Sequence, residues 1–80
     1  MEEWMNTEEK ILEIISTVLD IPESDLNADM AFSDIPEWDS LNHVHIISAI
    51  EEEFGFRFSL DMMMDIETIR DVVDIVEENK

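Results

Sequence analysis

Apolar residues recur at helical spacing in the first part of the chain, before Pro22. They are Ile11, Leu12, Ile15, Val18 and Leu19. Residues three and four positions apart share one face of a helix, so this spacing predicts an amphipathic first helix. Either Asn6 or Thr7 can act as its N-cap, and Glu8 and Glu9 follow in the first turn, where the helix dipole favours acidic side chains.

A second helix is predicted between Asp39, a good N-cap, and Gly55, a good residue to end a helix. We expect its buried stripe to consist of Leu41, Val44, Ile47, Ile50 and Phe54. Ile46 and Ala49 are expected on the margins of that stripe.

The C-terminal part of the chain predicts one short helix and one longer helix. Leu60 to Met64 are expected to form a single short turn. The last helix is expected to begin at Thr68 or Asp65, and its apolar residues keep helical spacing. They are Ile66, Ile69, Val72, Val73 and Val76. We find no convincing strand pattern.

Residues 20–39, between the first two helices, show no persistent period. Pro22, Asn27, Ser33 and Pro36 interrupt the segment. Its apolar residues, which we expect to hold it against the bundle, are Leu26, Met30, Phe32, Ile35 and Trp38. A loop of this length is often functional. The pattern therefore predicts an all-α fold: a small four-helix bundle, with three longer helices plus one short helix and a long loop between the first and second helices.

The composition predicts one acidic domain over residues 1–80, with residues 1–5 frayed. The chain has 80 residues, 22 Asp and Glu against 4 Lys and Arg, and a formal net charge of −18. A field of this sign repels nucleic acid and anionic membranes and attracts basic protein surfaces. We therefore expect no nucleic-acid binding, no membrane insertion and partners with basic surfaces.

Cysteine is absent, so no side chain of this protein can hold a thioester or a zinc thiolate site. A thioester would need a thiol supplied by an added group. The sequence has no basic segment followed by an apolar stretch, and no apolar run long enough to span a bilayer. We expect a cytoplasmic protein.

Ser40 follows Asp39 at the predicted start of the second helix. The first amides of a helix lack intrahelical partners, and the dipole places partial positive charge there. A phosphate attached to the Ser40 hydroxyl would therefore be favoured.

The loop and the second helix together resemble the acyl carrier proteins and their peptidyl carrier relatives. In the loop the resemblance is carried by Asp25-Leu26, Asp29, Phe32, Asp34-Ile35 and then Asp39-Ser40-Leu41. In the second helix it is carried by Leu41, Val44, Ile46-Ile47, Ala49-Ile50 and Glu51-Glu52-Glu53-Phe54-Gly55. Ile66-Glu67-Thr68-Ile69 is similar to the start of the family's fourth helix. The similarity covers nearly the whole chain from Asn6 on.

The resemblance implies a carrier and not an enzyme. Ser40 would receive 4′-phosphopantetheine from coenzyme A, with Asp39 as the helix cap beside it, and the arm would carry acyl or aminoacyl groups as thioesters. The implied partners are a phosphopantetheinyl transferase and basic-surfaced enzymes that handle those groups, and the implied state is a monomer. The residues expected to bind partners are Leu41, Val44, His45, Glu51 and Glu52.

Three residues depart from the pattern of fatty acid synthesis. Trp38 stands where a glycine is common, and His43 and His45 stand where small polar or acidic residues are usual. These departures favour a specialised lipid, polyketide or nonribosomal-type pathway. Trp38 is also expected to anchor the loop, and the histidines are expected to be exposed. Met62-Met63-Met64 is expected either to fill the core and its rim or to line an opening for an acyl chain.

Other functions have less support in the sequence. The main alternative is an acidic helical interaction or regulatory module that carries no prosthetic group. Ser40 and His43 are helical neighbours, but no nucleophile elbow or orienting carboxylate accompanies them. His43 and His45 are poorly spaced for zinc, and the loop carboxylates lack the calcium-loop pattern. We therefore predict no metal site.

Overall fold

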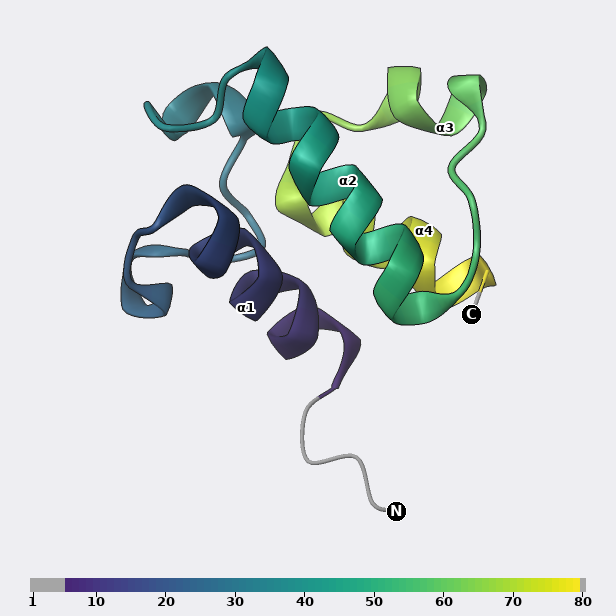
Figure 1. Cartoon of the computed structure of the whole chain (residues 1–80), viewed down its shortest axis with the longest axis horizontal. Helices are drawn as coiled ribbons and strands as arrows, with labels where there is room; N and C mark the ends of the chain where they lie inside the picture. The colour runs from purple at the N-terminus through teal and green to yellow at the C-terminus, as the bar shows by residue number, and fades with distance from the viewer. Residues whose placement is uncertain (1–5, 80) are drawn as a thin grey trace.

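A computed structural model of the chain describes residues 6–79. It contains helices α1 (Thr7–Leu19), α2 (Ser40–Phe54), α3 (Leu60–Asp65) and α4 (Ile69–Asn79), with short 3₁₀ turns at Glu23–Asp25 and Phe32–Asp34 in the long loop (Figure 1). This confirms the predicted all-α, four-helix arrangement with one short helix. The expected fraying of residues 1–5 lies outside the described residues.

Asn6 is the N-cap of α1. Its side chain accepts a hydrogen bond from the Glu9 amide at 2.8 Å, and the Glu9 carboxylate accepts one from the Asn6 amide at 3.1 Å. This reciprocal pair satisfies two amides that a helix start leaves open. The helix ends where Asp20 adopts a left-handed conformation with φ of 58°, two residues before Pro22.

The three longer helices supply the most deeply buried side chains. These are Ile11 and Ile15 of α1, Ile46 and Ile50 of α2, and Ile69, Val72 and Val76 of α4. Helices α1 and α2 run side by side in opposite directions, and α4 packs behind them (Figure 1). Helix α3 contributes no buried residue and lies at the edge of the core.

The predicted buried stripe of α2 is wrong in its first half. Leu41 and Val44 are 65% and 57% exposed, whereas Ile46, which was expected on the margin, is fully buried. A helix turns about 100° per residue. Leu41 and Ile50 are nine positions apart, so their side chains point about 180° away from each other. A strict three-residue spacing thus drifts around the helix, and the start of α2 extends past α1 and α4 (Figure 1).

The long loop is fastened to the start of α4 by main-chain hydrogen bonds. The amides of Ile69 and Arg70 donate to the carbonyls of Met30 and Ala28 at 3.1 and 2.7 Å, and the Phe32 amide donates to the Glu67 carbonyl at 2.9 Å. The loop thereby satisfies amides that the helix itself cannot. Of the expected anchors, Leu26 and Ile35 are buried, and Met30, Phe32 and Trp38 are half-buried against the core.

Thr68, and not Asp65, caps α4. The Thr68 hydroxyl accepts a hydrogen bond from the Asp71 amide at 3.2 Å, and the Asp71 carboxylate accepts from the amides of Glu67 and Thr68 at 2.9 and 3.1 Å. The hydrogen bond from the Glu67 amide is the main cause that lowers the pKa of Asp71. The predicted apolar face of α4 is buried throughout.

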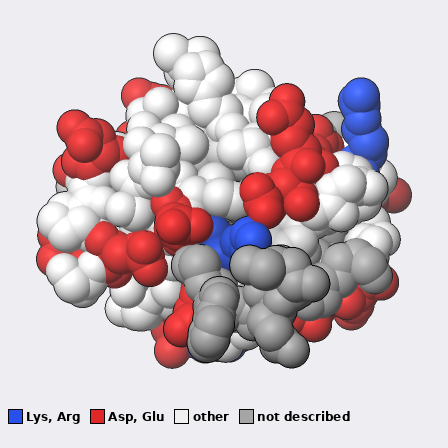
Figure 2. All heavy atoms as spheres, turned by 60° about the horizontal axis from the view of Figure 1, so that its bottom comes forward, with Lys and Arg blue, Asp and Glu red and all other residues white. Residues whose placement is uncertain are grey.

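Among residues 6–79, Arg70 and Lys10 form ion pairs that link the elements. Arg70 of α4 pairs with Glu8 of α1 at 3.5 Å and with Asp29 of the loop at 3.2 Å, and Lys10 of α1 pairs with Glu53 of α2 at 3.1 Å. The Asp and Glu side chains are spread over the face of the molecule shown in Figure 2 and do not gather in one patch there. None of the helices between residues 6 and 79 has the length and apolar character needed to cross a membrane.

Candidate functional site

Ser40 is the first residue of α2, and its side chain is exposed. Asp39 is the N-cap, as predicted: its carboxylate accepts a hydrogen bond from the Asn42 amide at 2.8 Å, and its carbonyl accepts from the His43 amide at 2.8 Å. The Asn42 side chain in turn donates to the Glu37 carbonyl at 3.0 Å. These bonds hold the helix start and leave the Ser40 hydroxyl without a hydrogen-bond partner among residues 6–79.

An aromatic cluster supports the chain just before Ser40. The Trp38 ring stacks on Phe32, with ring centres 4.1 Å apart and planes 15° apart. The Trp38 indole N–H donates to Nδ1 of His43 at 2.9 Å, and His43 meets Phe32 edge-on at 5.5 Å. Trp38 therefore anchors the loop, as expected, and it does so on α2. The sequence analysis missed this cluster because His43 was expected to be exposed.

His43 is half-buried, which corrects that expectation, whereas His45 is exposed as predicted. Burial lowers the pKa of His43. A neutral ring suits the observed geometry, since Nδ1 can accept the indole hydrogen only when it carries no proton. Nδ1 of His43 is therefore engaged with Trp38, and none of the hydrogen bonds among residues 6–79 joins His43 to Ser40 as an activating base.

The residues predicted to bind partners differ in their environments. Leu41, Val44, His45 and Glu52 are exposed on α2. Glu51 is half-buried, and its carboxylate accepts a hydrogen bond from the Phe58 amide at 2.8 Å. Glu51 thus ties the chain after α2 back to the helix, a role that the sequence analysis did not identify.

The Glu51-Glu52-Glu53 run ends α2 just before Gly55, which has φ of 74°. Acidic groups are unfavourable at this negative end of a helix. Glu51 is compensated by the Phe58 amide and Glu53 by Lys10, so only Glu52 lacks such a contact among residues 6–79. The sequence analysis had treated the three glutamates alike.

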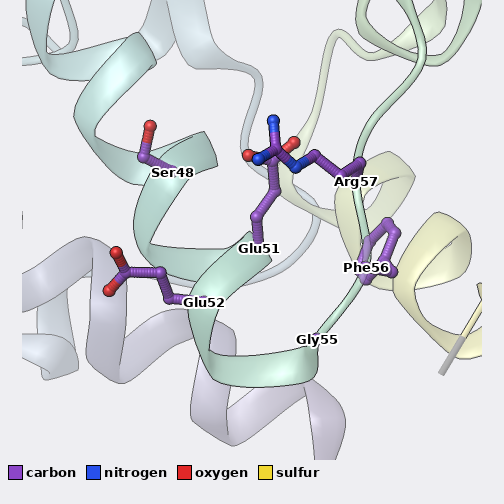
Figure 3. Close-up of a pocket in the computed structure, with 6 residues that line it drawn as sticks. All are labelled: Ser48, Glu51, Glu52, Gly55, Phe56 and Arg57. Carbon is purple, nitrogen blue, oxygen red and sulfur yellow. The ribbon is translucent and has the colours of Figure 1, made fainter.

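Two adjoining hollows lie between α2 and the chain that follows it. One, of about 460 Å³, is lined by Ser48, Glu51, Glu52, Gly55, Phe56 and Arg57 (Figure 3). The other, of about 280 Å³, is lined by His43, Val44, Ile47, Ser48, Glu51, Arg57, Phe58 and Met63. They share Ser48, Glu51 and Arg57, so they lie next to each other beside α2.

The three methionines have three different positions. Met62 is half-buried against the core, and its sulfur accepts a hydrogen bond from the Ser59 amide at 3.4 Å. Met63 lines the smaller hollow, and Met64 is 73% exposed. Met62 therefore packs as the core interpretation predicts, but it also lines a separate hollow of about 280 Å³ with Asp71 and Ile75 of α4. Met63 borders the hollow beside α2.

No group of three or more His, Cys, Asp or Glu side chains within the described part of the chain is placed to hold a metal ion. The acidic residues of the loop therefore do not converge on one point there.

The fold and the site together define a class of protein. A small helical bundle presents a single serine on the first turn of a helix, and the residues around it fit a phosphorylated group: the hydroxyl is exposed, the helix dipole favours an anion, and the Asp39 carboxylate is turned onto the Asn42 amide. These features are those of a protein that carries a covalently attached group.

The comparisons with known proteins agree. The family model described as "Phosphopantetheine attachment site" matches residues 9–76. An acyl carrier protein of Acidothermus cellulolyticus is 38% identical over 66 residues, covering 82% of this chain and 79% of the relative, and one of Solidesulfovibrio magneticus is 34% identical over 76 residues, covering 95% and 97%.

Solved structures show the same fold. The holo acyl carrier protein of Geobacter metallireducens has a TM-score of 0.82 at 27% identity, covering 92% of this chain and 85% of that one. The holo acyl carrier protein of Nitrosomonas europaea has a TM-score of 0.78 at 30% identity, covering 92% and 95%. This chain belongs to the phosphopantetheine attachment family, among the acyl carrier proteins. Its cofactor is 4′-phosphopantetheine, and its role is that of a thioester carrier.

Proposed function

We propose that Ser40 is the residue to which 4′-phosphopantetheine is attached, and that the chain carries acyl or aminoacyl groups without catalysing their reactions. The observation that carries this proposal is the exposed Ser40 hydroxyl on the first turn of α2, beside the Asp39 cap. When bound, the arm supplies the thiol that this cysteine-free chain lacks. The chain's own part is to hold α2 rigidly and to present the serine to solvent.

The partners proposed are a phosphopantetheinyl transferase and enzymes with basic surfaces that load and use the arm. The net charge of −18 supports this choice, because it attracts basic surfaces over a distance. Tethered cargo needs no tight complex, since the arm keeps its effective concentration high. The monomeric state and the extent of the domain, residues 1–80, stay predictions.

A specialised lipid, polyketide or nonribosomal-type pathway is the further part of the proposal. The hydrogen bond between Trp38 and His43 supports it, since two of the three residues that depart from the fatty-acid pattern contact each other close to Ser40. With this cluster, the surface beside Ser40 differs from that of a carrier that has a glycine at the position of Trp38.

The test is an intact-mass measurement after incubation with coenzyme A and a broad-specificity phosphopantetheinyl transferase. The wild-type chain is expected to gain the mass of one phosphopantetheine and Ser40→Ala to gain none. Ser48→Ala is the matched control, because Ser48 is another exposed serine of α2. Modification that persists in Ser40→Ala, or a wild-type chain that several such transferases leave unmodified, would refute the proposal.

A further inference from the structure

The hydrogen bond between Trp38 and His43 spans the serine proposed to carry the arm. Trp38 lies before Ser40, at the end of the long loop, and His43 lies after it, on the first turn of α2. The indole N–H of Trp38 donates to Nδ1 of His43 at 2.9 Å. This bond therefore ties the loop end to the helix start on either side of Ser40, and separating the two segments would break it.

The tie is supported by a part of the loop that is itself fastened to the rest of the fold. Phe32 stacks on Trp38 and meets His43 edge-on, and its amide donates to the Glu67 carbonyl, just before α4, at 2.9 Å. All three rings are half-buried. The His43 ring thus links the loop, anchored at the start of α4, to the helix that begins with Ser40.

The hydrogen bond requires a neutral His43. Nδ1 accepts the indole hydrogen only when it carries no proton, so the one ring proton is on Nε2. In the protonated ring both nitrogens are donors, and the indole N–H of Trp38 would face another N–H. Burial lowers the pKa of His43, so the neutral ring prevails at neutral pH and is lost only below the ordinary value of about 6.5.

The charged groups around His43 do not reverse this direction. Glu51 of α2 and Arg57 of the following chain line a hollow together with His43, and α3 contributes no charged residue to that hollow. Glu51 favours a proton on the ring and Arg57 opposes it. The loop contacts His43 through uncharged aromatic rings, and the Asp39 carboxylate, next along the chain, accepts the Asn42 amide. None of the ion pairs among residues 6–79 involves His43.

We propose that Trp38 and His43 are positioning residues for the attachment of the arm, an inference that rests on the proposed function. Their hydrogen bond is a latch: while it is closed, it holds the loop end against the first turn of α2 and keeps Ser40 in the position in which the transferase meets it. When His43 takes up a proton, the latch opens and the loop end is released. The chain then accepts the arm readily at neutral pH and more slowly in acid.

NMR spectroscopy follows the latch directly. The indole N–H signal of Trp38 is assigned by comparison with Trp4→Phe, which removes the signal of the other tryptophan of the chain. Between about pH 7.5 and about pH 5.5 the Trp38 signal is expected to shift in the wild type and to stay in place in His43→Gln, whose side-chain oxygen accepts the same hydrogen without titrating. His45 is still present in His43→Gln, so a shift that persists in this variant overturns the latch.

Arm transfer by a broad-specificity phosphopantetheinyl transferase measures the consequence at neutral pH. Trp38→Phe keeps a ring that can stack on Phe32 but loses the N–H, and His43→Leu keeps an apolar side chain but loses the acceptor. Each is expected to lower kcat/KM for the chain about two- to tenfold, as for the loss of one hydrogen bond, whereas His43→Gln and Trp4→Phe stay near the wild type. The double variant is expected to be no slower than either single variant, because both substitutions remove the same bond.

The pH profile of transfer completes the test. The ratio of kcat/KM for the wild type to that for His43→Gln cancels the transferase's own pH dependence, and it is expected to fall by at least about twofold between neutral pH and pH 5.5. Melting curves confirm that each variant is folded. A constant ratio, or Trp38→Phe that accepts the arm as fast as Trp4→Phe, overturns the positioning role. A wild-type chain that gains no arm refutes the proposed function and the positioning role together, whereas the NMR titration, which needs no arm, still reports the latch itself.

Discussion

Helices α4 and α2 both carry apolar residues at helical spacing, yet they use them differently. In α4 the residues Ile69, Val72, Val73 and Val76 are all buried. In α2 the buried residues are Ile46, Ile47 and Ile50, whereas Leu41 and Val44 lie mostly in solvent. The apolar face of α4 packs into the core. The start of α2 keeps apolar side chains that the core does not need, next to the serine proposed to carry the arm.

The strongest test of this comparison replaces one buried and one exposed apolar residue of α2 with alanine. Ile50→Ala is expected to lower the free energy of unfolding by about 2–5 kcal/mol, because it opens a cavity in the core. Leu41→Ala is expected to change it by less than about 0.5 kcal/mol, but to slow arm transfer to Ser40. Urea denaturation and transfer rates measure the two effects. Equal destabilisation by both substitutions would show that the start of α2 belongs to the core.

The helix caps allow a second comparison of α2 with α4. Asp39→Ala and Thr68→Ala each remove a side-chain acceptor from the first turn of a helix. Each is expected to cost about 0.5–2 kcal/mol of stability in urea denaturation. Only Asp39→Ala should also slow arm transfer, since it loosens the turn that holds Ser40. A similar slowing by Thr68→Ala would mean that general stability, and not the local cap, controls the reaction.

The glutamates that end α2 provide a third, smaller effect. Glu51→Gln weakens the hydrogen bond to the Phe58 amide and is expected to cost about 1 kcal/mol. Glu52→Gln makes the same change in net charge and is expected to raise the stability slightly, because it removes an uncompensated charge from the negative end of α2. Thermal melting of the two variants side by side measures the difference. Identical melting temperatures would contradict a structural role for Glu51.

The smallest expected effect is the pH dependence contributed by His43. Because burial lowers its pKa in the folded chain, protonation favours the unfolded chain. This stability is fully present above the unfolded pKa of about 6.5 and is lost as the pH falls from there to the folded value. The wild type should therefore lose stability between pH 7.5 and 5.5 more steeply than His43→Gln, as followed by chemical denaturation at each pH. Parallel curves would show that the Trp38 contact does not depend on a neutral His43.

Features set by neighbouring residues were predictable from the sequence. Helix caps and terminators act within about one helical turn, so the residue types alone indicate that α1 begins near Asn6 or Thr7 and that α2 runs from the Asp39 cap to Gly55. Only the structure chose Asn6 over Thr7 as the cap of α1. The same local argument placed Ser40 on the first turn of a helix. The spacing in α4 was also sufficient, since its four apolar positions fall on one narrow face.

The remaining features depend on residues far apart in the chain or on which side of a helix is covered. The drift of the α2 stripe left two faces available, and only the positions of α1 and α4 decided that Ile46 is buried and Leu41 is not. The bonds from α4 to the loop join residues about forty positions apart. Local sequence thus determined where the helices lie and where Ser40 is presented. Tertiary packing decided which faces are buried and which polar groups meet, because those contacts form only when distant segments come together.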